Sequence, residues 1–262
     1  MVQVKDLHVA FSDHGHLEEA VHGISFTIDD GEIVGIVGES GSGKTQTALA
    51  MAGLSPRHAQ LTGEISIDGK NLVGMSRDDL RSMQGNEITM VFQEPMTSLN
   101  PTMRIGRQVE EALAIHTNLS KDERREKALQ AMRDVELPDV DRAYRKYPHE
   151  MSGGQRQRVM IASAIIGHPK LLIADEPTTA LDVTIQAEIL KLLQKLNVEK
   201  GMSILFISHD LRVIRKLCSR VIVMNQGLIV EEGPVEEVFN HPKDDYTKKL
   251  IASIPTRKRV SE

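Results

Sequence analysis

The amino-acid sequence predicts an α/β fold in which parallel β-α-β units are combined with an inserted helical part. Three observations predict it. A glycine-rich loop at 38–45 separates an apolar strand from a stretch compatible with a helix. Apolar segments at 171–174, 204–207 and 221–224 alternate with helical patterns, which is typical of parallel β-α-β units. From about 105 to 167 the hydrophobic period becomes that of helices.

The first third of the chain supplies the strands that precede and follow the loop. Short apolar or alternating segments predict strands at 2–11, 21–28, 33–37 and 87–92 and a hairpin-like piece at 63–68. A helix is expected over 45–54, directly after the loop.

The loop itself reads GESGSGKT, from Gly38 to Thr45. Its glycines allow backbone N–H groups to turn inward onto an anion, Lys44 brings a mobile positive charge, and the Thr45 hydroxyl suits a bound magnesium ion. A strand before such a loop and a helix after it place phosphates at a helix N-terminus. The loop therefore predicts a nucleoside triphosphate site, and a flexible Gly/Ser linker is a poor alternative because linkers do not follow directly from a buried strand.

The block from about 105 to 167 is expected to be a helical insertion. Ala128, Leu129, Met132 and Val135 form one apolar stripe at helical spacing, Ser120 and Glu123 have the spacing of a capping box, and Pro138 closes that helix. The block ends with MSGGQRQR, which begins a helix at 152 that ends near 167.

The last third returns to alternating strands and helices. Helices are expected over 183–199 and 211–217, and a hairpin over 221–231 turns near Asn225 to Gly227. Gly233-Pro234 predicts a further helix with proline at its first position.

Polar residues with possible catalytic roles follow three of the predicted strands. Asp175 ends the strand LLIAD and suits a magnesium ion, and Glu176 is placed to polarise an attacking water. His209 follows the strand at 203–207 and can register a γ-phosphate. Gln93 follows the strand at 88–92 as a neutral ligand for the magnesium shell. Each of these residues, taken singly, also has an interpretation without chemistry. The acid pair Asp175-Glu176 would simply begin a loop, His209 would simply begin a helix, and Gln93 would be a surface residue.

The run Met151 to Arg158 is the most discriminating one. A serine and two glycines at a helix start make a second anion site, which one chain does not need for one triphosphate unless it serves the nucleotide of a partner subunit. Here the sequence resembles the ATP-binding subunits of ABC transporters. The resemblance covers nearly the whole chain and includes GESGSGKT, MSGGQ, LLIADE, Thr179-Ala180-Leu181-Asp182 and Ser208-His209-Asp210 in the family's order.

The resemblance implies a P-loop NTPase core of the RecA type with a small antiparallel β subdomain and an inserted helical subdomain, the ABC ATPase fold. Residues 1–95 and 160–262 would form the core and the β subdomain, and about 96–159 the helical subdomain, within a single domain over 1–262. The expected cofactors are ATP and Mg²⁺.

The resemblance also assigns residues to the site. ATP would be bound by Phe11, Gly38, Glu39, Ser40, Gly41, Ser42, Gly43, Lys44, Thr45 and Gln46, and in trans by Ser152, Gly153, Gly154, Gln155 and Asp182 of a partner. Magnesium would be held by Thr45, Gln93 and Asp175. The catalytic set is Glu176 as base, His209 as γ-phosphate sensor, Lys44 and Gln93. Two ATP molecules would thus lie between two subunits in a head-to-tail dimer.

Three further runs resemble the ATPases of dipeptide, oligopeptide and nickel importers. They are VFQEPMTSLNP from Val91, EPTTALD from Glu176, and Asn240-His241-Pro242 with Tyr246-Thr247 and Leu250. In that family the segment Glu94 to Pro101 would contact a cytoplasmic helix of the membrane subunit. The implied partners are a second ATP-binding subunit, identical or different, two transmembrane permease subunits and, indirectly, a substrate-binding protein.

Several alternatives stay open at this stage. Peptides, nickel and other small solutes all suit the family, and the chain can be half of a longer tandem protein. A non-transport ABC protein acting on ribosomes or DNA shares the ATP motifs but usually has two such domains or a coiled-coil insertion. A P-loop kinase or GTPase would leave MSGGQ and His209 without a task.

Composition narrows the classes further. The net charge is −5, with 32 basic and 37 acidic residues, which gives no support for binding nucleic acid. The sequence contains no apolar run of membrane-spanning length and no visible secretory signal. Its single cysteine, Cys218, excludes an internal disulfide and is expected in the core. We expect a peripheral protein at the cytoplasmic face of the inner membrane.

Phe11 generates the first testable prediction. By location it matches the aromatic residue that the family stacks on adenine, although it also suits a core position with the stack supplied by another residue such as Val21. Since base stacking contributes roughly 1–3 kcal/mol in other nucleotide sites, Phe11→Ala should weaken ATP binding without abolishing it, as measured by calorimetric titration. Equal affinities in variant and parent would remove Phe11 from the site.

Overall fold

The computed structural model describes residues 1–13, 16–93, 98–179 and 181–254. Its strands are β1 (Val2–Asp13), β2 (His16–Ile28), β3 (Ile33–Val37), β4 (Ala59–Ile67), β5 (Lys70–Asn71), β6 (Ile88–Val91), β7 (Leu171–Asp175), β8 (Ser203–Ile207), β9 (Arg220–Asn225) and β10 (Leu228–Pro234). Its helices are α1 (Lys44–Met51), α2 (Arg77–Met83), α4 (Ile105–His116), α5 (Lys121–Asp134), α6 (Val140–Ala143), α7 (Gly153–Ile165), α8 (Val183–Lys200), α9 (Leu211–Leu217), α10 (Val235–Asn240), α11 (Asp245–Ala252) and the 3₁₀ turn Pro148–Glu150.

The strands form two sheets. A six-stranded sheet has the order β10-β9-β3-β8-β7-β6, and all its pairs are parallel except the edge pair β9-β10. A four-stranded antiparallel sheet has the order β2-β1-β4-β5. The predicted α/β fold with a mostly parallel sheet and a small antiparallel part is therefore confirmed.

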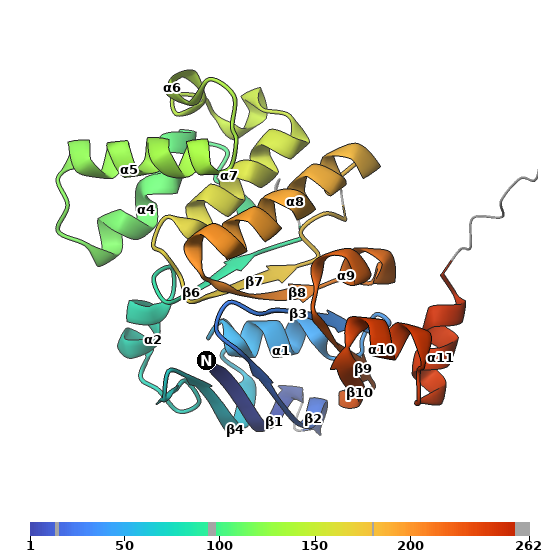
Figure 1. Ribbon diagram of the computed structural model, residues 1–262. Helices are drawn as coiled ribbons and strands as arrows, with labels where there is room; N and C mark the ends of the chain where they lie inside the picture. Colours follow the sequence, from blue (N-terminus) through green and yellow to red (C-terminus); the bar gives the residue numbers. More distant parts are fainter. Residues whose placement is uncertain (14–15, 94–97, 180, 255–262) are drawn as a thin grey trace, which may run out of the picture.

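The parallel sheet is buried on both faces because successive apolar side chains of its central strands pack into apolar clusters on opposite sides. Every residue of β3 is buried, and successive side chains of a strand point to opposite faces. Val34 and Ile36 belong to the apolar cluster that contains the buried face of α1, whereas Ile33 and Val37 belong to the cluster that contains α7 and α8. Figure 1 shows α1 and the four-stranded sheet on one side of the central sheet and α7 and α8 on the other.

The helical block has the predicted local features. Ala128, Leu129 and Met132 of α5 and the following Val135 are buried, as the apolar stripe predicts. The capping box is present, because Glu123 N donates to Ser120 Oγ and Ser120 N donates to Glu123 Oε2 at 2.8 Å. In Figure 1, α4, α5 and α7 lie together on the same side of the central sheet as α8, opposite α1. The helix α7 is continuous through residue 160, where the core was predicted to resume.

Several boundaries differ from the sequence prediction. Pro234 is the N-cap of α10 and not its first residue, because β10 continues through Pro234 in its pairing with β9. The piece expected as a hairpin at 63–68 is the end of β4, which forms a short antiparallel hairpin with β5 and also pairs with β1 along most of its length. The helices α2 and α11 were not predicted; both are short and begin at capping side chains, Ser76 and Asp244.

Two smaller expectations concern the core and the membrane. Cys218 is buried and belongs to the main apolar cluster, and its burial raises the pKa of the thiol. In the described part of the chain, each helix is too short or too polar to cross a lipid bilayer.

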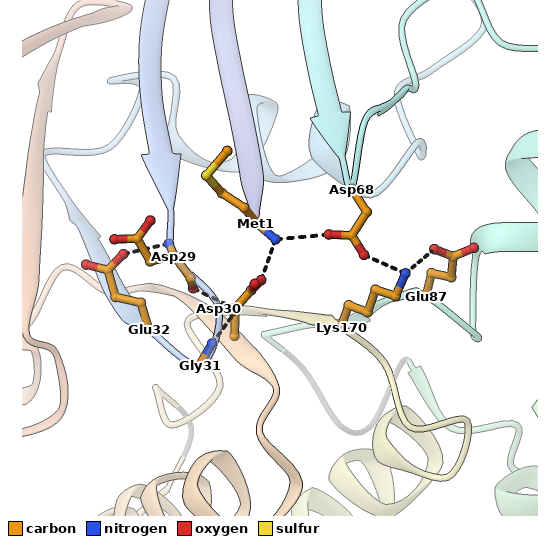
Figure 2. A network of polar contacts seen from close by, with 9 residues as sticks. Met1, Asp29, Asp30, Gly31, Glu32, Asp68, Glu87 and Lys170 are labelled. Carbon is orange, nitrogen blue, oxygen red and sulfur yellow. Dashed lines mark hydrogen bonds and ion pairs between the residues drawn. The ribbon is translucent and has the colours of Figure 1, made fainter.

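A network of charges connects the two sheets at the end away from the phosphate loop (Figure 2). The N-terminal ammonium of Met1 contacts Asp30 and lies 3.0 Å from Asp68 Oδ1. Lys170 Nζ, at the start of β7, lies 2.6 Å from Asp68 Oδ2 and 3.2 Å from Glu87 Oε2. Lys170 and the N-terminal ammonium lower the pKa of Asp68 to about 2. Because most of these groups are exposed, we expect the network to contribute little to stability.

A second, less exposed pair closes the β2–β3 turn onto β9. Arg220 Nε and Nη2 each donate to a carboxylate oxygen of Glu32 at 2.9 Å, and Nη1 also contacts Glu232. The side chains of Arg220 and Glu32 are 20% and 16% exposed. Burial works against ionisation of Glu32, but the bonds from Arg220 and the Asp29 amide outweigh it and leave the pKa of Glu32 lowered.

We therefore expect Arg220→Met to destabilise the fold by about 1–3 kcal/mol, because it leaves a largely buried carboxylate without its partner. The measurement is the midpoint of urea unfolding. Lys248→Met is the matched control: its pair with Asp245 is exposed, so its midpoint should correspond to a change below about 0.5 kcal/mol. Equal midpoints for both variants would show that the Arg220–Glu32 pair stabilises the fold no more than the exposed Lys248–Asp245 pair does.

Candidate functional site

The loop between β3 and α1 is shaped by glycines that lie against neighbouring backbone. A Cβ on Gly38 would stand 2.2 Å from the carbonyl oxygen of Met224, and one on Gly43 would stand 2.8 Å from that of Ala20. Gly43 also has φ 100°, in the region that disfavours side chains. The loop is thus held tightly between β9 and β2.

The N-terminus of α1 offers unpaired donors to an anion. Gly43 is the N-cap and no side chain caps the helix, and the first intrahelical bond runs from Thr47 N to Gly43 O. The amides of Lys44, Thr45 and Gln46 therefore have no intrahelical acceptor. Such a helix start favours phosphate through both its N–H groups and its dipole.

Lys44 is folded back onto the loop. Its Nζ donates to Gly38 O and Glu39 O, both at 2.8 Å, and lies 3.3 Å from Ser42 Oγ. Burial lowers the pKa of this ammonium, and the charges of Glu176 and Asp175 oppose the shift. The charge of Lys44 is thus held beside the loop by carbonyl groups that a phosphate can replace as partners.

Asp175 lies at the carboxyl end of β7, beside the start of α1. The Thr45 side chain hydrogen-bonds its carboxylate. Burial raises the pKa of Asp175, while the bond from Thr45 and the charge of Lys44 oppose that shift. A hydroxyl and a carboxylate side by side are the oxygen ligands that Mg²⁺ prefers.

Glu176 is the centre of the polar contacts at the site. Its Oε2 accepts from Gln93 Nε2 at 3.1 Å and from Thr179 Oγ1 at 2.9 Å, and it lies 3.0 Å from His209 Nδ1. The side chain of Glu176 is 18% exposed and that of His209 is 59% exposed. Three residues that follow different strands of the parallel sheet therefore meet at one carboxylate oxygen.

The backbone at Glu176 is also unusual. Its φ is 46°, in the left-handed region, and its N–H donates to Ile207 O at 2.9 Å. A non-glycine residue held in this region costs about 1–3 kcal/mol and is typical of functional sites. The kink turns the chain at the end of β7, immediately after Asp175.

A cavity of about 670 Å³ lies over the loop. The predicted site residues that line it are Phe11, Ser40, Gly41, Ser42, Gly43, Lys44, Thr45, Gln46, Gln93, Glu176 and His209. Gly38 and Glu39 adjoin it through their bonds to Lys44, and Asp175 through Thr45. The Phe11 ring lies 5.7 Å from the ring of His58, at an angle of 56°.

The residues predicted to act on a partner's nucleotide lie elsewhere. Ser152 is the N-cap of α7 and forms a capping box with Gln155, and Asp182 is the N-cap of α8, accepting from Thr184 N and Ile185 N. A Cβ on Gly154 would stand 2.8 Å from Ile185, so the start of α7 packs closely on α8. Neither Asp182 nor any residue of Ser152, Gly153, Gly154 and Gln155 lines the cavity of its own chain.

Sequence reasoning missed three residues of the cavity region. Glu18 and Ala20 of β2 line the cavity, and Thr179 donates to Glu176. The spacing of Thr179, three residues after Glu176, was a usable signal for a local turn contact. The positions of Glu18 and Ala20 depend on how β2 folds over the loop, which no local pattern indicates.

Comparison with known proteins places the chain in a family. The model of the ABC transporter family matches residues 21–179. The peptidoglycan transport ATP-binding protein YejF of Agrobacterium fabrum is 50% identical over 97% of this chain, which spans 47% of that protein. A probable peptide ABC transporter ATP-binding protein of Sinorhizobium fredii is 48% identical, with 99% of this chain and 78% of that protein covered. The oligopeptide transport ATP-binding protein OppD of Bacillus subtilis is 47% identical, with 100% and 74% covered.

Solved structures agree with the sequence relatives. A dimeric ATP-binding cassette in a post-hydrolysis state, bound to ADP and Pi, has a TM-score of 0.80 and 32% identity over 90% of this chain and 99% of its own. A protein of Clostridium perfringens that is part of an ABC transporter complex has a TM-score of 0.78 and 29% identity over 97% and 95% of the two chains. The loop, the acid pair at the end of β7 and these similarities lead to one conclusion: the chain belongs to the ABC transporter family, as one of its ATP-binding cassettes.

Proposed function

We propose that this chain is the ATP-hydrolysing subunit of an ABC transporter that imports peptides. The observation that carries the proposal is the meeting of Gln93, His209 and Thr179 at Glu176 Oε2, in the cavity above the phosphate loop. A binding module without turnover would have no need of a carboxylate in this position.

The cavity suits ATP with magnesium. Its floor is the uncapped start of α1, and Gln46 Oε1 is buried there without a hydrogen-bond partner among the residues that the structure describes. Thr45 and Asp175 offer a hydroxyl and a carboxylate side by side, and Gln93 adds an amide oxygen nearby. These residues would hold Mg²⁺, which when bound neutralises charge that develops on the phosphates.

The chain's own residues would divide the chemistry as follows. Lys44 leaves the carbonyls of Gly38 and Glu39 for the phosphates, which the loop amides also bind. Glu176 accepts a proton from the attacking water and His209 donates a hydrogen bond to the γ-phosphate. For this, Glu176 has to exchange at least one of its three present contacts for the water.

A second ATP-binding subunit would complete each site. Ser152 and the following glycines stand at the start of α7, away from the cavity of their own chain, and a helix start is suited to bind the phosphates of another chain's nucleotide. The similar cassette bound to ADP and Pi is dimeric. The partner is a second copy or a related chain, arranged head to tail.

The contact with the permease would lie at the border between the core and the helical block. A hollow of about 310 Å³ is lined by residues of both, among them Leu54, Phe92 and Met160, and a second of about 550 Å³ adjoins it at Leu54 and Gln84. Leu54 and Phe92 are each 41% exposed. The predicted coupling segment Glu94 to Pro101 borders the first of these hollows through Ser98 and Leu99, while residues 94–97 lie outside the described residues.

In this proposal the membrane partner consists of two permease subunits in the inner membrane, and this chain lies on their cytoplasmic side. The relatives named for peptide and oligopeptide transport support peptides as the solute, in preference to nickel.

Glu176→Gln tests the proposed base. We expect ATP binding to be retained, turnover to fall by about 10²–10⁴-fold, and a closed ATP-bound dimer to accumulate, because the amide cannot accept the proton of the water. Phosphate release and size-exclusion chromatography with ATP measure these effects. Glu199→Gln, at an exposed position on α8, is the control and should turn over ATP at the parental rate. Normal turnover by Glu176→Gln would exclude Glu176 as the base.

Leu54→Glu tests the permease contact. Leu54 lines both hollows, and burying a charge there against the membrane subunits is costly. The variant should therefore fail to associate with those subunits, while ATP binding by the isolated chain stays unchanged. Co-purification with the permease measures the association. Val198→Glu, at a position 81% exposed on α8, is the control. Undiminished co-purification of Leu54→Glu would show that the permease binds elsewhere.

A further inference from the structure

The C-terminal helix α11 reaches the phosphate loop through one hydroxyl. Glu39 N–H, in the loop, donates to Tyr246 Oη at 2.8 Å, although the two residues are 207 positions apart. Tyr246-Thr247 is also one of the runs that resemble the ATPases of dipeptide, oligopeptide and nickel importers. The structure gives its tyrosine a contact at the site.

The peptide group that donates to Tyr246 also accepts a hydrogen bond from Lys44. The carbonyl of Gly38 and the N–H of Glu39 belong to the same peptide bond, and the carbonyl accepts from Lys44 Nζ at 2.8 Å. Lys44 and Tyr246 therefore hold opposite edges of one planar group. A rotation of this peptide would break both bonds at once.

The tyrosine is itself firmly placed. Asp244 caps α11 by accepting from Tyr246 N at 2.8 Å, and Glu231 of β10 accepts from Lys243 N and Asp244 N at 2.9 and 3.1 Å. Tyr246 packs against the main apolar cluster, together with other residues of α11 and the following turn, Leu250, Ile251 and Ile254. The hydroxyl is thus fixed to the core by the start of α11 and by the apolar side of that helix.

The loop side of the contact has little freedom to adapt. Gly38 lies so close to Met224 O and Ser42 Oγ that even a Cβ would not fit, at 2.2 and 2.6 Å. Within the described part of the chain, the Tyr246 hydroxyl bonds the Gly38–Glu39 peptide from a distant helix, whereas Met224 and Ser42 pack against its glycine and Lys44 binds its carbonyl.

We propose that Tyr246 is a positioning residue for nucleotide binding: its hydroxyl fixes the Gly38–Glu39 peptide and so sets the shape of the phosphate loop and the resting place of Lys44. The inference deepens the proposed function and rests on it. Tyr246 does not touch the reacting atoms, so it acts on nucleotide affinity and leaves the chemical step unaltered.

Tyr246→Phe in the full chain tests the proposal. Loss of one hydrogen bond to the loop should weaken binding of Mg²⁺-ADP about threefold to tenfold in calorimetric titration. The KM for ATP should rise to a similar extent and kcat should stay within about twofold, since uniform binding is removed. Amide exchange should quicken in the peptide that contains Glu39 but not in the β3 residues before it.

Asp245→Asn is the matched control, because it removes an exposed ion pair with Lys248 on the same helix and leaves the hydroxyl in place. It should keep parental nucleotide affinity, and the urea midpoint of Tyr246→Phe should remain close to that of the parent. Parental affinity in Tyr246→Phe, an equal loss in Asp245→Asn, or a fall in kcat with unchanged KM would each overturn the inference. A parent that binds no ADP would overturn the proposed function and this inference with it.

Discussion

The site depends on the parallel pairing of β3, β8, β7 and β6, because parallel strands end at the same edge of a sheet. The register pairs Val91 with Ala174, Asp175 with Ile207, and Ile36 with Ile207. The residues that follow these strand ends are Gln93, Glu176, His209 and the phosphate loop. Hydrogen bonding of apolar strands thus brings together polar groups that are far apart in the sequence.

The polar groups of the site lie at this edge because the strands themselves are buried. The side chains of β3, β7 and β8 are buried along their whole lengths, in two apolar clusters on opposite faces. Charged residues can therefore stand only where the strands end, and there Asp175 and Lys44 are still partly desolvated. The burial that stabilises the sheet thus also shifts the pKa values of Lys44 and Asp175 at the loop.

The sequence predicted the parts of this arrangement that are encoded locally. The apolar runs at 33–37, 171–174 and 204–207, the glycine spacing of the loop and the capping box at Ser120 each depend on residues close together in the chain. The roles of the individual site residues stay a prediction, although the cavity brings eleven of them together. Contacts between distant segments had no local signal: Glu18 and Ala20 reach the cavity because β2 folds over it, and Tyr246 reaches Glu39 from 207 residues away.

The start of α7 is the second surface to which we assign a function. Ser152 caps this helix and does not line its own chain's cavity, which is why we propose that it serves the nucleotide of a second chain. Opening and closing of the site would then be a change in how two chains meet, which suits a protein that converts nucleotide turnover into movement of a membrane partner.

The claim that each site is shared between two chains is tested most directly by mixing two inactive variants. Lys44→Ala removes the loop's charge, and Ser152→Glu places a negative charge against the partner's phosphates. Each alone should have little ATPase activity, whereas an equal mixture should recover up to roughly a quarter of the parental rate, because half of the head-to-tail dimers then contain one intact site. A parent that hydrolyses ATP while the mixture stays inactive, or a fully active Ser152→Glu variant, would contradict the account.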